Sequence, residues 1–156
     1  MYPTIKKVWS VLLAMMLLLS SCAAMAEEAT ATPADLGAET TGKAQWTVLI
    51  YLCGTDLESE GSMATYNLEE IAKTTPNDSV NVVIQTGGAK EWHAQETVGL
   101  DIATDKLQRY SYGAEGYSPV EEQPLANMAD ASTLTEFIQW GAQTYPAEKY
   151  ALVLWD

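Results

Sequence analysis

Three short apolar runs constrain the fold of this sequence more than any other feature, and each is followed closely by glycine or aspartate. They are Trp46–Leu52, Val80–Gln85 and Tyr150–Trp155. All three are rich in β-branched and aromatic residues, which is typical of strands that are buried on both faces of a parallel sheet. The sequence therefore predicts three core strands that need helices on both sides of them.

Helical patterns lie between these runs. A helix is expected to begin between Asp56 and Ser62, since either side chain can cap it, and to end before Pro76. A second helix is predicted over residues 131–144, because its apolar positions repeat every three or four residues. These two helices supply the cover that the strands require.

The segment between the second strand and the second helix is harder to assign. Residues 92–98 and 107–112 show a weak alternation that predicts a two-stranded hairpin, and glycines after Tyr112 indicate a loop. The order of elements predicts an α/β domain with a mostly parallel sheet flanked by helices. Because the sequence stops one residue after the third core strand, with no helix to cover it, we expect the fold to be truncated there.

The first 26 residues have the pattern of an export signal. Lys6 and Lys7 precede the apolar run Val8–Leu19, and Ala24–Ala26 matches the small residues of a cleavage site. These features predict a secretory signal peptide over residues 1–26, cleaved after Ala26.

An alternative processing route is left open by the same segment. Leu19–Cys22 resembles a lipobox, in which Cys22 becomes the lipidated first residue and anchors the protein to a membrane. Under either route the protein is exported, as a secreted protein or as a cell-surface lipoprotein.

Composition separates a spacer from the folded part and excludes one class of partner. Residues 27–43 are small, polar and acidic, which predicts a disordered spacer before a domain at 44–156. The chain has 8 Lys and Arg against 21 Asp and Glu, a formal net charge of -13. Nucleic-acid binding needs a basic surface, so this balance argues against a nucleic-acid partner.

The carboxyl ends of the predicted strands carry the candidate site residues. Cys53–Asp56 follows the first strand, Thr86–Gly88 the second and Asp156 the third. Open α/β sheets place their sites at this edge. Asp56 and Asp156 are candidate carboxylates at the edge of a site, where they could orient a histidine or hold a cation. The simpler alternatives are a helix cap for Asp56 and a plain edge residue for Asp156.

Cys53 and His93 are the only cysteine and histidine of the predicted domain. A cysteine nucleophile needs a base that can form its thiolate, so this pair is the one catalytic dyad that the domain itself could supply. The apolar neighbourhood of Cys53 favours instead a small buried thiol that closes a strand. We interpret His93 as an exposed residue of the predicted hairpin, so no catalytic residue is assigned.

Seven segments, in order along the chain, also carry a resemblance to a known family; they are Trp46–Glu58, Asn67–Ile71, Val82–Gly88, Leu107–Tyr110, Asn127–Asp130, Leu134–Ile138 and Tyr145–Asp156. Together they resemble the first half of the catalytic domain of the clostripain family of secreted cysteine peptidases, over about residues 44–156. The last segment is the most specific of them.

The resemblance implies a fold, an activity and the place of the catalytic pair. It implies a caspase-like α/β sandwich that cleaves protein or peptide substrates after Arg or Lys, with calcium required by some members. The catalytic histidine and cysteine of the family would both lie beyond Asp156, so this chain alone is expected to be an inactive amino-terminal fragment. The alternative is a non-catalytic extracellular binding module of flavodoxin-like topology.

Overall fold

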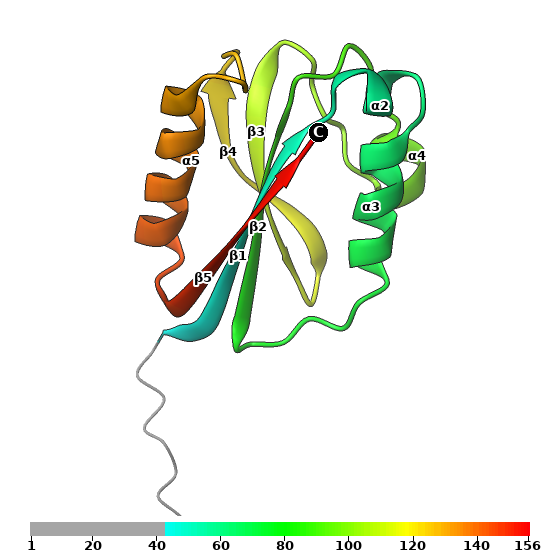
Figure 1. Ribbon diagram of the computed structural model, residues 1–156. Helices are drawn as coiled ribbons and strands as arrows, with labels where there is room; N and C mark the ends of the chain where they lie inside the picture. The colour runs from blue at the N-terminus through cyan, green and yellow to red at the C-terminus, as the bar shows by residue number, and fades with distance from the viewer. Residues whose placement is uncertain (1–42) are drawn as a thin grey trace, which may run out of the picture. The chain divides into compact units, whose positions relative to one another are not determined.

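The computed structural model describes residues 43–156, and nine elements make up this part of the chain (Figure 1). The strands are β1 (Ala44–Cys53), β2 (Val80–Gly87), β3 (Lys106–Gly113), β4 (Gly116–Pro124) and β5 (Ala147–Trp155). The helices are α2 (Thr55–Ser59), α3 (Met63–Ala72), α4 (Ala94–Val98) and α5 (Ala131–Thr144). The predicted signal peptide with Cys22 and Ala26 lies outside the described residues, as does the predicted spacer except for Lys43.

The five strands form one mixed sheet in the order β4-β3-β2-β1-β5. β1 pairs in parallel with both β2 and β5, whereas β2–β3 and β3–β4 are antiparallel. The α/β class and the positions of the three predicted strands are confirmed, but β5 is a largely exposed edge strand and is not buried on both faces. The expectation of a mostly parallel sheet was too simple, because a whole antiparallel hairpin extends the sheet beyond β2.

The predicted hairpin was wrong in its first strand. Residues 94–98 form the short helix α4, which buries Ala94 fully and ends at Gly99 with φ of +74°. The partner of β3 is instead β4, in the segment expected to be a loop. β4 lacks an apolar run because it is a half-exposed edge strand, and such strands also tolerate Pro119.

The helices cover the two faces of the sheet separately, which gives three layers (Figure 1). α5 packs alone on one face, where Phe137 is fully buried against Leu49 and Tyr51. α3 and α4 lie on the other face and bury Leu68 and Ala94. None of the helices in residues 43–156 has the length and apolar character of a membrane span.

Gly141 lets α5 approach the sheet closely. A Cβ atom at this position would lie 2.5 Å from Cδ2 of Leu49, well inside van der Waals contact. Glycine normally weakens a helix, so its presence in the third turn of α5 is explained by this contact with β1.

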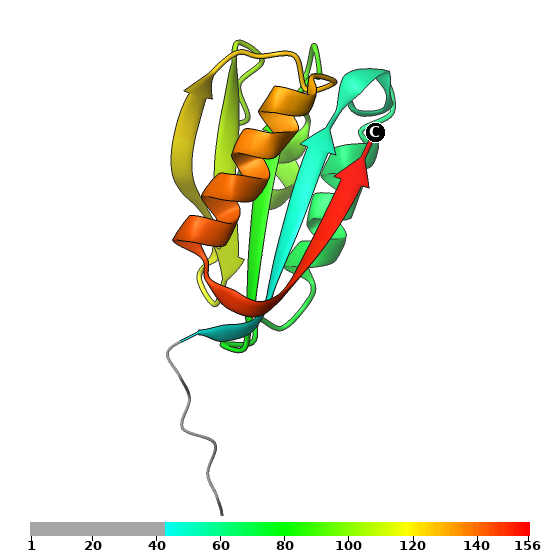
Figure 2. The same cartoon turned by 60° about the vertical axis from the view of Figure 1, so that its left-hand side comes forward.

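β5 is the edge strand at the other end of the sheet, and its apolar side chains are poorly covered. Leu152, Val153 and Leu154 are 43%, 41% and 63% exposed. In the described part of the chain β5 pairs only with β1, and α5 lies over the middle of the sheet rather than over β5 (Figure 2).

Buried tyrosines predict a loss of stability at alkaline pH. Burial raises the pKa of Tyr51 and of Tyr110 from 10.0 to about 12, and it also raises the pKa of Tyr117. The folded state therefore holds these phenol protons more tightly than the unfolded state, so stability falls as pH rises from 10 towards 12. Urea midpoints at pH 8, 10 and 11.5 should decrease in that order, and a constant midpoint would contradict this reasoning.

Candidate functional site

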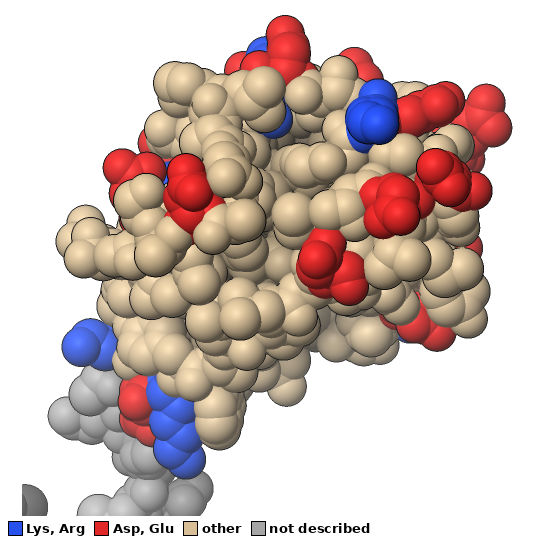
Figure 3. Space-filling model, turned by 45° about the horizontal axis from the view of Figure 1, so that its top comes forward, with Lys and Arg blue, Asp and Glu red and all other residues tan. Residues whose placement is uncertain are grey.

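A cavity of about 620 Å³ opens at the carboxyl ends of β1 and β5. Its walls are the ends of these strands and the loop between β4 and α5; the main lining residues are Tyr51, Cys53, Thr55, Gly88, Asn127, Met128, Leu134, Leu154, Trp155 and Asp156. Figure 3 views the molecule from this edge and shows that most charged side chains around it are acidic. The structure thus places a cavity at the edge where the sequence predicted a site.

Glycines at the strand ends shape this cavity. Gly88 has φ of +80°, and a Cβ atom there would lie 2.8 Å from the sulfur of Cys53. At the preceding Gly87, a Cβ atom would lie 2.7 Å from the sulfur of Met128. The backbone after β2 therefore packs directly against the side chains that line the cavity, which only glycine permits.

Cys53 and Asp156 meet in the cavity. Leu52 pairs with Trp155, so the next residue on each strand reaches the same edge. Burial, and then the negative charge of Asp156, raise the pKa of the Cys53 thiol. A neutral thiol is a poor nucleophile, so these surroundings agree with a strand-closing thiol and not with an activated one.

The structure does not bring His93 to Cys53. His93 is the residue before α4 and does not line the cavity, and its Nδ1 lies 3.4 Å from Oε1 of Glu58. The expectation of an exposed hairpin residue was also wrong, because its backbone N–H is bonded to Glu58 and only about a third of the side chain is exposed. The described residues therefore contain no cysteine–histidine dyad.

Asp56 lies apart from this cavity. It is exposed and lines a smaller pocket of about 240 Å³ together with Ser59, Glu60 and Lys90. Gly54, and not Asp56, is the capping residue before α2, and Asp56 lies in the first turn of this helix. A negative charge in the first turn interacts favourably with the helix dipole, so Asp56 has a structural role.

The described residues offer no evident calcium site. Between 43 and 156, no three His, Cys, Asp or Glu side chains are placed to share a metal ion. Calcium binding needs several oxygen ligands on one ion, so no step is assigned to calcium.

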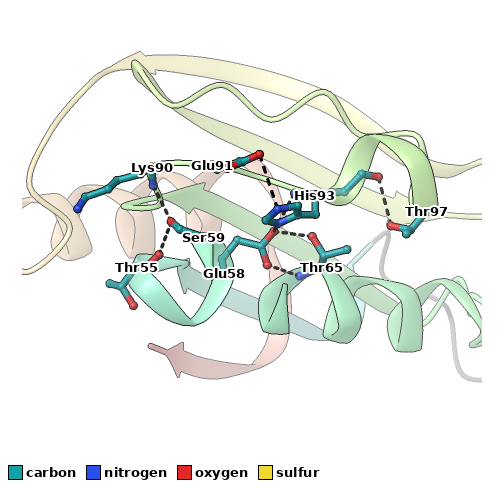
Figure 4. A network of polar contacts seen from close by, with 9 residues as sticks. Thr55, Glu58, Ser59, Thr65, Lys90, Glu91, His93 and Thr97 are labelled. Carbon is teal, nitrogen blue, oxygen red and sulfur yellow. Dashed lines mark hydrogen bonds and ion pairs between the residues drawn. The ribbon is translucent and has the colours of Figure 1, made fainter. Parts of the chain in front are cut away.

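The sequence did not reveal the importance of Glu58, a buried carboxylate near the site that accepts three hydrogen bonds. Glu58 is fully buried, although it lies in the acidic stretch Asp56–Glu60. Its carboxylate accepts hydrogen bonds from the N–H of Thr65 at 2.8 Å, the hydroxyl of Thr65 at 2.6 Å and the N–H of His93 at 2.9 Å (Figure 4). No local pattern signals this role, because the partner His93 is distant in sequence.

The layered sheet with a cavity at the ends of its parallel strands defines a caspase-like α/β domain. A family model described as the clostripain family matches residues 50–156, so the chain belongs to this family. The family resemblance seen in the sequence is thereby confirmed.

Three solved structures show the same fold. A Bacteroides fragilis cysteine protease is 21% identical with a TM-score of 0.53, and the match covers 72% of this chain and 87% of that one. A clostripain from Bacteroides thetaiotaomicron, in complex with a peptide inhibitor, is 15% identical with a TM-score of 0.51, covering 72% and 89%. A secreted C11 cysteine protease from Bacteroides thetaiotaomicron, called iotapain, is 14% identical with a TM-score of 0.52, covering 72% and 29%. No curated protein matches the chain.

Proposed function

We propose that this chain is the amino-terminal half of the catalytic domain of an exported cysteine endopeptidase that cleaves peptide bonds after Arg or Lys. The observation that carries the proposal is the clostripain family match over residues 50–156. The strand-end cavity supports it, because open α/β sheets place their reactive groups at that edge.

The proposed reaction proceeds through an acyl-enzyme. A cysteine thiolate attacks the peptide carbonyl, a histidine gives the proton to the leaving amine, and water then releases the acyl group. Cys53 is a neutral thiol and His93 lies outside the cavity, so neither performs these steps. The catalytic histidine and cysteine are therefore proposed to come from sequence beyond Asp156, and this chain alone is proposed to be inactive.

Charge supports the proposed preference for basic substrates. Asp156 lines the cavity, and the negative charge of Asp130 adds to burial in raising the pKa of Tyr51 in the same cavity wall. A cationic Arg or Lys side chain is attracted to such a site, whereas an acidic side chain is repelled. Asp156 is positioned to hold either a substrate cation or the imidazolium of the histidine.

The assay uses the protein with the sequence that follows Asp156 and a pair of matched peptides. A fluorogenic peptide with Lys before the cleaved bond should be hydrolysed at least about a hundredfold faster than the same peptide with Glu there. Cys53→Ala should keep this activity within about twofold, because the thiol is not the nucleophile. Loss of activity in Cys53→Ala would assign catalysis to this residue, and a peptide bound but never cleaved would favour the flavodoxin-like binding module.

Export is proposed as part of the same function. The pattern in residues 1–26 supports it, and one structural relative is described as secreted. The mature protein should begin at Glu27, or at Cys22 if that residue is lipidated. Amino-terminal sequencing of exported material separates the two, and labelled palmitate should be incorporated only in the lipoprotein. A mature protein that retains Met1 would contradict both.

A further inference from the structure

We propose that α2 acts as a clamp that positions one wall of the strand-end cavity. Glu58 and Ser59 of α2 bind the segment after β2, residues 88–93, and so join it to the turn after β1. We call these two side chains and the groups they bind the α2 clamp. Its role in substrate binding rests on the proposed peptidase function, whereas its role in holding the cavity wall does not.

Glu58 forms the inner half of the α2 clamp. Its buried carboxylate is bonded to α3 through Thr65 and to the segment after β2 through the N–H of His93 (Figure 4). Burying a carboxylate is costly unless hydrogen bonds replace its hydration. The carboxylate has all three hydrogen-bond donors only when α3 and the segment after β2 are both in place. Its hydrogen bonds therefore fix the position of these two segments relative to each other.

Ser59 forms the outer half of the α2 clamp. Its hydroxyl donates to the carbonyl oxygen of Thr55 at 2.7 Å and accepts from the N–H of Lys90 at 2.9 Å. One side chain thus connects the first residue after the β1 turn to the segment after β2. Glu58 and Ser59 are adjacent in sequence, yet both reach the same segment.

The backbone between these contacts is tightly packed and strained. Thr55 has φ of +40°, which is unfavourable for a residue with a side chain. A Cβ atom at Gly54 would lie 2.9 Å from the Cβ atoms of both Ala89 and Glu58. Strain of this kind persists only when surrounding contacts hold it, and the α2 clamp supplies such contacts.

The clamped segments form the cavity wall. Thr55 and Gly88 both line the 620 Å³ cavity, and Gly88 packs against the sulfur of Cys53. Glu58 itself does not line the cavity. It is therefore a positioning residue, and releasing it should expose the thiol of Cys53.

The test measures alkylation of Cys53 by iodoacetamide in the 156-residue chain carrying Cys22→Ser. Glu58→Gln replaces one acceptor oxygen by a donor, so the alkylation rate should rise about tenfold. This faster rate should not depend on urea at low concentrations, because a local opening exposes little additional surface. Ser59→Ala should raise the rate as well, whereas Ser59→Thr keeps the hydroxyl and should restore it. His93→Ala keeps the bonded N–H and should stay within about twofold of the native rate.

A matched variant separates positioning from general loss of stability. Val82→Ala removes two methyl groups near the start of β2, where Val82 packs against the core on the α3 face and not against the cluster that Cys53 contacts, so it should raise the rate only as urea unfolds the whole chain. If Glu58→Gln behaves like Val82→Ala, or leaves the rate unchanged, the α2 clamp is not a positioning device.

A second measurement connects the clamp to substrate. In the protein that continues beyond Asp156, Glu58→Gln should raise KM for the Lys peptide by about tenfold with a smaller change in kcat. An equal fall in kcat with unchanged KM would refute the substrate role. If the native protein hydrolyses no peptide, the proposed function fails while the alkylation result still decides the clamp.

Discussion

Phe137→Ala is expected to lower the free energy of unfolding by about 3–5 kcal/mol. Phe137 is fully buried at the centre of α5, with its ring centroid 5.7 Å from Tyr51 and 6.2 Å from Trp140. In the described residues α5 is the only helix on its face of the sheet, so no neighbouring helix can move in to fill the space. A loss of this size is a large part of the stability of an ordinary domain, about 5–15 kcal/mol.

Urea unfolding followed by far-ultraviolet circular dichroism measures this loss. Gln139→Ala is the matched control, because Gln139 is exposed on the same helix and its truncation should change stability by less than about 0.5 kcal/mol. Equal midpoints for the two variants would show that α5 is not a structural part of the core.

Self-association through β5 is expected to disappear when lysines replace Leu152 and Leu154. Both side chains point to the α5 face and are largely exposed on a strand whose outer edge has no partner in residues 43–156. An apolar edge of this kind pairs readily with other chains, and charged residues prevent it. The native 156-residue chain should form oligomers at micromolar concentration, and the double variant should sediment as a monomer.

The opposite edge of the sheet provides the control for this experiment. Val120 is 39% exposed on β4, and Val120→Lys should leave the oligomers intact because β4 is already rich in charged residues. If the native chain sediments as a monomer, the prediction is wrong. If Val120→Lys dissociates the oligomers, the chains associate through β4 and not through β5.

β1 and β2 could be predicted because burial in the middle of the sheet leaves a continuous apolar run, whereas β5 carries the same kind of run although most of its side chains are exposed. β4 could not, since an edge strand with one solvated face carries Glu121, Glu122 and Pro119 and resembles a loop. α4 was mistaken for a strand because five residues are too few to separate the periods of a helix and a strand. Element length and burial, rather than propensity, decided which predictions were correct.

The candidate site was predictable only where strand ends define it. Cys53 and Asp156 follow parallel neighbours, so their meeting in the cavity follows from topology. Glu58 was hidden among exposed acidic residues, and its burial depends on donors at Thr65 and His93 that only the tertiary structure brings together. Motif and composition could not have distinguished Glu58 from the exposed Asp56.

The antiparallel β3–β4 hairpin begins and ends at the same end of the sheet, the carboxyl end of β2. β3 starts at the carboxyl end of β2, and β4 brings the chain back there before α5 begins. Because the hairpin adds an even number of strands, its length can vary without reversing the direction of α5 or β5. Evolution can therefore lengthen, shorten or remodel this outer part of the sheet while the floor of the cavity, built by β1, β2 and β5, keeps its geometry.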